Sequence, residues 1–338
     1  MSAFLARRAL ALPLILLGVS AVTFVLMHLI PGDPVRIFLG SEGAVPPEAI
    51  ERLRAQWGLD KPLYIQYFYY IANLLRGDLG YAIHTAQPVS QDLLRRLPAT
   101  LELSMAGFTI ALLISIPLGI ISAVKKDTWI DHLSRVTSLF FLSMPNFWIG
   151  LMLIYLLYFT FKVVPAPMGR LGLTDTPPPF ITGLYTIDSL LAGDLSTFVK
   201  SLKQLILPAL VLSFTSIGLI VRMLRSSMLE ILQMDYIRTA EAKGLSYFVI
   251  NCKHALRNAL IPTITILAIQ LGSLMGGNVV VETVFNWPGI GLYFVTAIQW
   301  LDYAPVIGIA VMIATIFVIF NFIADVVYAL IDPRIKYG

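Results

Sequence analysis

The chain has 338 residues, of which 57% are hydrophobic and 13% are charged, with a mean hydropathy of +0.80. A soluble domain carries roughly 25% charged residues, so this composition excludes an ordinary soluble protein and indicates an integral membrane protein. The net charge of +4 does not indicate a nucleic-acid partner, because the Lys and Arg residues are spread thinly along the chain.

The amino-terminal segment predicts a retained first transmembrane helix. Arg7 and Arg8 precede an uncharged run over residues 9–30. This run exceeds the roughly 7–15 residues of a signal-peptide core and lacks an obvious small-residue cleavage site. We therefore expect residues 1–30 to form a cytoplasmic N-terminus and a first transmembrane helix.

Residues 31–97 predict a small helical insertion outside the cytoplasm. The turn sequence Pro31-Gly32-Asp33-Pro34 is followed by two helices, over 47–57 and 62–76, each begun by a proline. Aromatic side chains crowd the second helix, at Tyr64, Tyr67, Phe68, Tyr69 and Tyr70. They fit an aromatic face at the membrane interface, or a platform for a docking protein or substrate.

Residues 98–338 predict the rest of a polytopic all-α membrane protein. Uncharged runs of about the length that crosses a bilayer recur along the chain. Including the first, they lie at residues 9–30, 103–124, 136–161, 204–221, 258–281 and 303–324. We expect six transmembrane helices. A seventh run, 283–301, is broken by Asn286-Trp287-Pro288-Gly289 and predicts a short interfacial or re-entrant helix.

Basic residues predict which side of the membrane each connection occupies. They gather before the first run, between the second and third, between the fourth and fifth, and after the sixth. The positive-inside rule then places both termini and the 236–262 segment in the cytoplasm. The opposite connection, 163–201, is rich in proline and glycine, and we expect it to be ordered by what it touches.

The 236–262 segment predicts a cytoplasmic helix-turn-helix that docks into a partner. A helix over 225–243 would end at Gly244, because glycine readily takes the left-handed conformation of a helix terminus. A second helix over 253–259 would lead back to the membrane. Small side chains at Ala240 and Ala242 would give the first helix a face that fits a groove.

Polar residues inside the predicted spans are candidates for a substrate path, because such residues are costly in a bilayer and usually face protein or water. These candidates are Ser143, Asn146, Gln270, Ser273, Asn278 and Glu282. The alternative is packing: Gly272 and Gly276 form a small-residue pair that favours close helix contact, where polar groups hydrogen-bond between helices.

The segment Ala240-Glu241-Ala242-Lys243-Gly244-Leu245 resembles the EAA loop of inner-membrane permeases in binding-protein-dependent ABC importers, which inserts into a cleft on the ATPase subunit. Further segments resemble the dipeptide/oligopeptide branch of that family across essentially the whole chain. They are 31–34, 59–62, 222–230, 254–259, 282–289 and 325–334. Glu241 departs from the arginine common in peptide permeases, and Gln233-Met234 precede Asp235 where an acidic residue is usual.

The resemblance implies a type I ABC importer permease fold in the bacterial inner membrane and an ATPase-coupling loop at 226–258. The implied coupling residues are Tyr236, Arg238, Ala240, Glu241, Ala242, Lys243, Gly244, Leu245, His254, Arg257 and Asn258. The implied partners are a second homologous permease, two ATP-binding subunits and an extracytoplasmic peptide-binding protein, besides membrane lipid. ATP and Mg would lie on the ATPases, because this chain lacks a phosphate-binding Gly-Lys-Ser/Thr loop.

The resemblance implies uptake of short peptides, with glutathione, nickel complexes or longer oligopeptides as alternative cargo. We expect no catalytic, cofactor-binding or metal site in this chain, because Cys252 is the only cysteine and the four histidines are scattered. A secondary transporter is a more distant alternative, but it would usually show an inverted repeat or a midplane charge pair. We see neither in the sequence.

Overall fold

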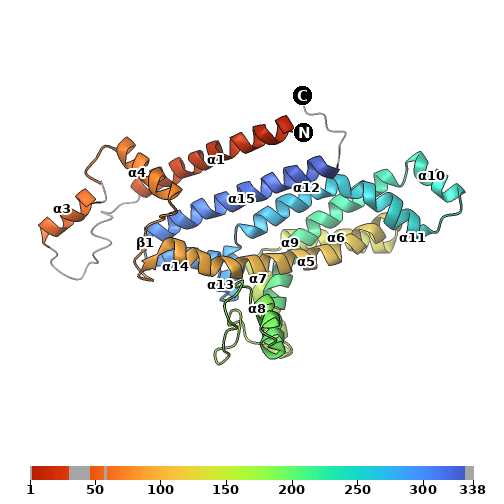
Figure 1. Cartoon of the computed structure of the whole chain (residues 1–338). Coiled ribbons are helices and arrows are strands. Elements are labelled where there is room, and N and C mark those ends of the chain that lie inside the picture. The colour runs from red at the N-terminus through yellow and green to blue at the C-terminus, as the bar shows by residue number, and fades with distance from the viewer. Residues whose placement is uncertain (1, 30–45, 57–58, 332–338) are drawn as a thin grey trace. The chain divides into compact units, whose positions relative to one another are not determined.

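The computed structural model describes residues 2–29, 46–56 and 59–331, and it divides into two compact units. The first unit is built around Arg96–Tyr293, and the second from Leu10–Arg95 and Phe294–Thr315. The elements in Figure 1 are α1 (Ser2–Leu29), α3 (Pro47–Gln56), α4 (Leu63–Leu75), β1 (Tyr81–Ala82), β2 (Gln87–Pro88), α5 (Val89–Val124), α6 (Trp129–Ser143), α7 (Asn146–Leu153), η1 (Ile154–Thr160), α8 (Tyr185–Leu191), α9 (Leu195–Ile231), α10 (Asp235–Ala242), α11 (Tyr247–Val249), η2 (Ile250–Ala255), α12 (Leu256–Met275), α13 (Val279–Val284), α14 (Ile290–Gln299) and α15 (Tyr303–Ile331).

Four of the described helices are long and apolar enough to cross a bilayer: α5, α9, the α11–α12 stretch and α15. The predicted third span, 136–161, is not straight, because α6 and α7 meet at an angle of 103°. Proline at position 145 explains the bend, since it disfavours helical backbone at Met144, which is extended at ψ 131°. Counting this pair as one gives five spans. The first predicted span, 9–30, falls on α1, where the described apolar helix is the shorter Pro13–Val25.

The predicted fifth span, 258–281, is wrong at its end. Helix α12 stops at Met275, and Gly277 takes a left-handed φ of +89° before α13 begins. The predicted break in the 283–301 run is present, because Asn286 also has a positive φ (+50°) in the turn between α13 and α14. Residues 276–301 therefore form two short helices joined by a tight turn.

Helix α9 is the central element of the first unit. Its buried residues recur at helical spacing, for example at Leu205, Leu212 and Ile220, and they join apolar side chains of neighbouring helices. It packs against α6, α8 and α12. Trp287 is buried in the same core and donates its indole N–H to the Ala99 carbonyl at 2.7 Å.

The second unit joins α1 to α4 through aromatic hydroxyls. Tyr67 and Tyr70 of α4 hydrogen-bond Ser20 and Thr23 of α1, at 3.0 and 3.2 Å. The predicted 62–76 helix is one residue shorter at each end, because the Pro62 backbone is extended and caps the helix. The predicted turn at 31–34 and position 57 of the predicted 47–57 helix lie outside the described residues.

Candidate coupling loop and polar contacts of the spans

The candidate coupling loop, residues 226–258, runs from the last turns of α9 through α10 to the start of α12. The predicted continuous helix over 225–243 is wrong: α9 ends at Ile231, and α10 is a separate helix. The Leu232 N–H still bonds the Met228 carbonyl, but Met234 turns to an extended ψ of 147°. The chain therefore changes direction before α10 begins.

Gly244 closes the loop's first helix as predicted, with a left-handed φ of +73°. Its N–H bonds the Glu241 carbonyl, and the Leu245 N–H bonds the Ala240 carbonyl. Ser246 then caps the next helix by accepting from the Val249 N–H. The predicted separate helix over 253–259 is instead part of the continuous helical stretch 247–275, which contains the π-helical segment η2.

The inner face of α10 packs on the loop's own chain. Ile237 and Ala240 are buried beside Ile250 of η2 and beside Leu224 and Met228 of α9. Ala240 therefore stabilises the loop from inside and does not offer a surface to a partner. Because these contacts reach the segments on both sides, the loop is attached to α9 and to the α11–α12 stretch together.

A polar bridge adds to this attachment. The Asn258 amide nitrogen of α12 donates to the Tyr236 hydroxyl of α10 at 2.8 Å, and also to the His254 carbonyl at 3.2 Å. Asn258, itself bonded to the His254 carbonyl, thus fixes Tyr236 in place, and all three are predicted coupling residues. Their role in the structure is to hold α10 against α12.

The outer face of the loop is exposed. Among the predicted coupling residues, it presents Arg238, Glu241, Ala242, Lys243, Gly244, Leu245 and Arg257. Tyr247 and Phe248, which are not among the predicted coupling residues, are also exposed, by 78% and 76%. The sequence signal for these two residues is a pair of adjacent aromatic side chains directly after the helix-capping Ser246. In the structure they form an exposed apolar patch, which is typical of an interaction site.

Two of the predicted path residues hold helices together. The Thr215 hydroxyl of α9 donates to the Asn146 side chain at 2.9 Å, and the Gln270 amide of α12 donates to the Ser216 hydroxyl at 3.1 Å. These pairs join α7 and α12 to adjacent positions of α9, which favours the packing interpretation for both. The two serine candidates, Ser143 and Ser273, lie exposed on helix surfaces.

Asn278 and Glu282 do not lie on the fifth span. Asn278 caps α13 by accepting from the Val281 N–H. Glu282 is fully buried, and its carboxylate accepts from the Thr100 hydroxyl at 2.8 Å and from the Leu292 N–H at 3.0 Å. Burial of this carboxylate among protein groups favours the packing interpretation for Glu282.

Replacing Glu282 by alanine should destabilise the protein without changing its cargo. The substitution leaves the buried Thr100 hydroxyl without its acceptor, at a cost of about 1–3 kcal/mol. Thermal unfolding of the purified transporter measures this, with Thr283→Ala at the exposed neighbouring position as the control. Normal stability with altered cargo preference would restore the path interpretation.

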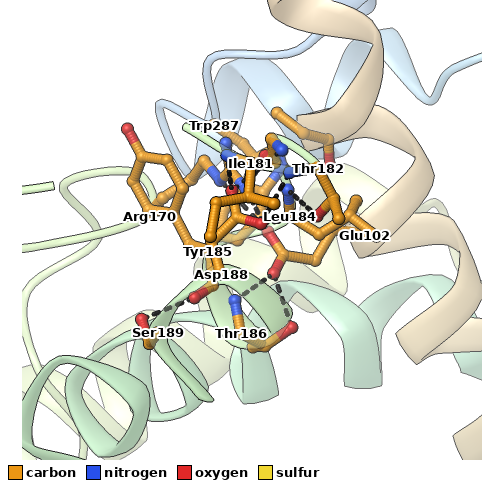
Figure 2. Close-up of polar contacts among 12 residues, drawn as sticks. Glu102, Arg170, Ile181, Thr182, Leu184, Tyr185, Thr186, Asp188, Ser189 and Trp287 are labelled. Carbon is orange, nitrogen blue, oxygen red and sulfur yellow. Dashed lines mark hydrogen bonds and ion pairs between the residues drawn. The ribbon is translucent and has the colours of Figure 1, made fainter. Parts of the chain in front are cut away.

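A buried ion pair fixes the 163–201 segment to α5. The Arg170 guanidinium donates to Glu102 at 2.6 and 3.1 Å and to the Gly183 carbonyl at 2.7 Å, and it lies over the Tyr185 ring. The second Glu102 oxygen accepts from the Thr186 N–H and hydroxyl, so both carboxylate oxygens are paired (Figure 2). This segment is therefore ordered by contacts within the chain.

Asp188 organises the turn before α8. Its carboxylate accepts from the Thr182 hydroxyl and from the N–H groups of Ile181, Thr182 and Gly183 (Figure 2). Burial alone would raise the pKa of Asp188, but these hydrogen bonds to the charged form outweigh it and lower the pKa. The carboxylate is consequently charged throughout the neutral range.

This turn should be insensitive to pH between 5 and 8 but should loosen in Asp188→Asn. A lowered folded-state pKa means that the stabilisation is present above the unfolded value of about 3.9 and is lost only as pH falls through the lower folded value. Hydrogen exchange at Thr182 and Gly183, corrected for intrinsic rates, measures this. Asp194→Asn is the control, because asparagine also caps a helix well. Faster corrected exchange at pH 5 in the unmodified chain would contradict the assignment.

The chain matches two family models. Residues 115–337 match the binding-protein-dependent transport system inner membrane component, and residues 1–104 match the N-terminal membrane component of such systems. It is 46% identical to the probable D,D-dipeptide transport system permease of Escherichia coli, over 99% of this chain and 97% of that protein. It is 42% identical to the dipeptide transport system permease of Alkalihalophilus pseudofirmus, over the full length of both.

A more distant relative and a solved structure agree with this family. The oligopeptide transport system permease of Bacillus subtilis is 38% identical over the full length of both chains. A structure of the inward-facing MetNI methionine ABC transporter superposes with a TM-score of 0.53 at 16% identity, covering 71% of this chain and 96% of that one. The latter likeness establishes the fold of an ABC importer permease.

Proposed function

Since the chain belongs to the inner membrane components of binding-protein-dependent transport systems, we propose that it passes short peptides from an extracytoplasmic binding protein into the cytoplasm. Dipeptides are the favoured cargo, because relatives at 40–46% identity are named for dipeptide transport. Longer oligopeptides are the second candidate, because the relative named for them is 38% identical.

The chain is a multi-pass inner membrane protein and a non-catalytic subunit of an ABC transporter. In the proposed complex it pairs with a second, homologous permease above two ATP-binding subunits, which hold ATP and Mg. Both termini and the coupling loop face the cytoplasm in this arrangement, as the distribution of basic residues predicts. Binding protein then docks on the opposite side, where the 163–201 segment lies.

One observation supports the coupling role above all: α10 is anchored to the helices on both sides while its outer face is free. Ile237 and Ala240 pack inward, and Tyr236 is bridged to Asn258. A push on the exposed side of α10 would therefore move α9 and α12 with it. Closure of the ATPases on ATP binding supplies that push in our proposal, and hydrolysis resets it.

The test is ATP hydrolysis by the complex reconstituted in lipid, with and without binding protein and a panel of di- and oligopeptides. We expect stimulation that requires binding protein, peptide and an intact 240–245 segment. Stimulation by a non-peptide ligand would support the ABC importer role but contradict the proposed peptide cargo. Failure of the chain to associate with any ATPase would overturn the coupling role.

A further inference from the structure

A pocket of ≈ 240 Å³ lies between α6 and α9 in the first unit. Its walls come from one face of each helix, since the lining positions recur three and four residues apart. The residues that characterise it are Arg135, Leu139 and Leu142 of α6, and Val221, Arg222 and Arg225 of α9. Arginine thus lines one part of the pocket and leucine and valine another.

Two contacts fix the pocket along its length. A Cβ at Gly218 would lie 2.7 Å from the Ser138 carbonyl oxygen, so the helices approach closely there. Further along, the Arg225 guanidinium donates two 2.6 Å hydrogen bonds to the buried Asp131 carboxylate. This ion pair neutralises Arg225 and sets the separation of the helices, so the pocket is built by the fold.

The other two arginines keep their charges available. Among the residues that the structure describes, Arg135 and Arg222 form no ion pair, and both are exposed. Arg135 immediately precedes the uncharged stretch 136–161, and Arg222 immediately follows the uncharged stretch 204–221. Both arginines are therefore the first charged residues beyond the apolar part of their helices. Residues at this position along a transmembrane helix lie at the depth of the lipid headgroups.

The apolar part of the pocket continues onto the outside of α6. Leu139 is 54% exposed, and neighbouring Val136 and Phe140 are 64% and 48% exposed. This exposed apolar surface belongs to the predicted third span, and it suits an acyl chain. Guanidinium groups suit a phosphate, because they present several donors in a plane.

We propose that this arginine pocket binds an anionic phospholipid, with the phosphate at Arg135 and Arg222 and an acyl chain along Leu139 and Leu142. The ligand chemistry is a phosphate joined to an apolar chain. Basic pockets between transmembrane helices are known to hold anionic headgroups. The inference is independent of the cargo, because it concerns lipid binding and not transport.

The experiment titrates short-chain phosphatidylglycerol into the detergent-solubilised full complex and counts bound lipid by native mass spectrometry. The double variant Arg135→Gln/Arg222→Gln should bind about 25-fold more weakly, from roughly fivefold for each guanidinium. Leu139→Trp, which keeps both charges and fills the apolar part, should also reduce binding. Phosphatidylcholine should bind weakly to every variant.

Lys125→Gln/Lys126→Gln is the matched control, because it removes the same charge from exposed residues next to α6 but outside the pocket. Binding retained by this control and lost in the arginine variant supports the proposal. Equal loss in both would show general charge attraction and overturn it. Inorganic phosphate that displaces the lipid completely, and binds as well alone, would assign the site to free phosphate instead. An arginine variant that no longer assembles leaves Leu139→Trp to decide.

Discussion

Replacing Glu102 by glutamine should destabilise the protein by about 3–5 kcal/mol, because it leaves the Arg170 charge buried without a partner. Both side chains of this pair are about 95% buried, with exposed fractions of 5% and 6%. The Gly183 carbonyl remains as an acceptor for Arg170, but a neutral carbonyl does not replace the lost charge. We expect the 163–201 segment to lose its attachment to α5.

Thermal unfolding of the purified complex and protease cleavage within 163–201 measure this loss. Glu102→Gln combined with Arg170→Met should recover much of the stability, because neither charge is then left unpaired. Asp175→Asn breaks the exposed ion pair to Lys200 in the same segment and should change stability little. Equal effects of Glu102→Gln and Asp175→Asn would contradict the role of burial.

The sequence predicted features that depend on neighbouring residues along the chain. Uncharged runs located the spans, and Gly244 marked the end of a loop helix, because both signals are local. Pro145, at which the third span bends, is also a local signal. It lies inside a 26-residue uncharged run, which by length alone predicts one straight span. Proline alone does not locate such a bend, because Pro117, Pro208 and Pro262 lie inside continuous helices.

Features that depend on distant residues could not be predicted. Glu102 and Arg170 are 68 positions apart, and neither residue's sequence neighbourhood indicates the other as its partner. The sequence makes Glu282 a candidate path residue, because an acid near a span is costly unless it faces water or protein. In the structure Glu282 faces protein, because its carboxylate accepts a hydrogen bond from Thr100, which is 182 positions away. Only the fold decides between the two environments.

Replacing Gly244 by valine should uncouple ATP hydrolysis from transport. Gly244 has a φ of +73°, and a β-branched residue in this left-handed region costs about 1–2 kcal/mol, or roughly 5–30-fold in the population of the native loop. A Cβ here meets no atom within 4 Å, so backbone strain is the only direct effect. The measurement is peptide-stimulated ATP hydrolysis together with peptide uptake by the reconstituted complex.

Gly193 provides the matched control, because it has nearly the same φ of +71° and an equally open environment but lies outside the coupling loop. Gly193→Val should carry the same local strain and leave uptake and stimulated hydrolysis nearly unchanged. Gly244→Asn should retain most coupling, since asparagine tolerates the left-handed region. If both valine variants lost uptake equally, general instability would explain the result. Normal uptake by Gly244→Val would refute the coupling role, because the strain acts at the turn that sets the exposed face of α10.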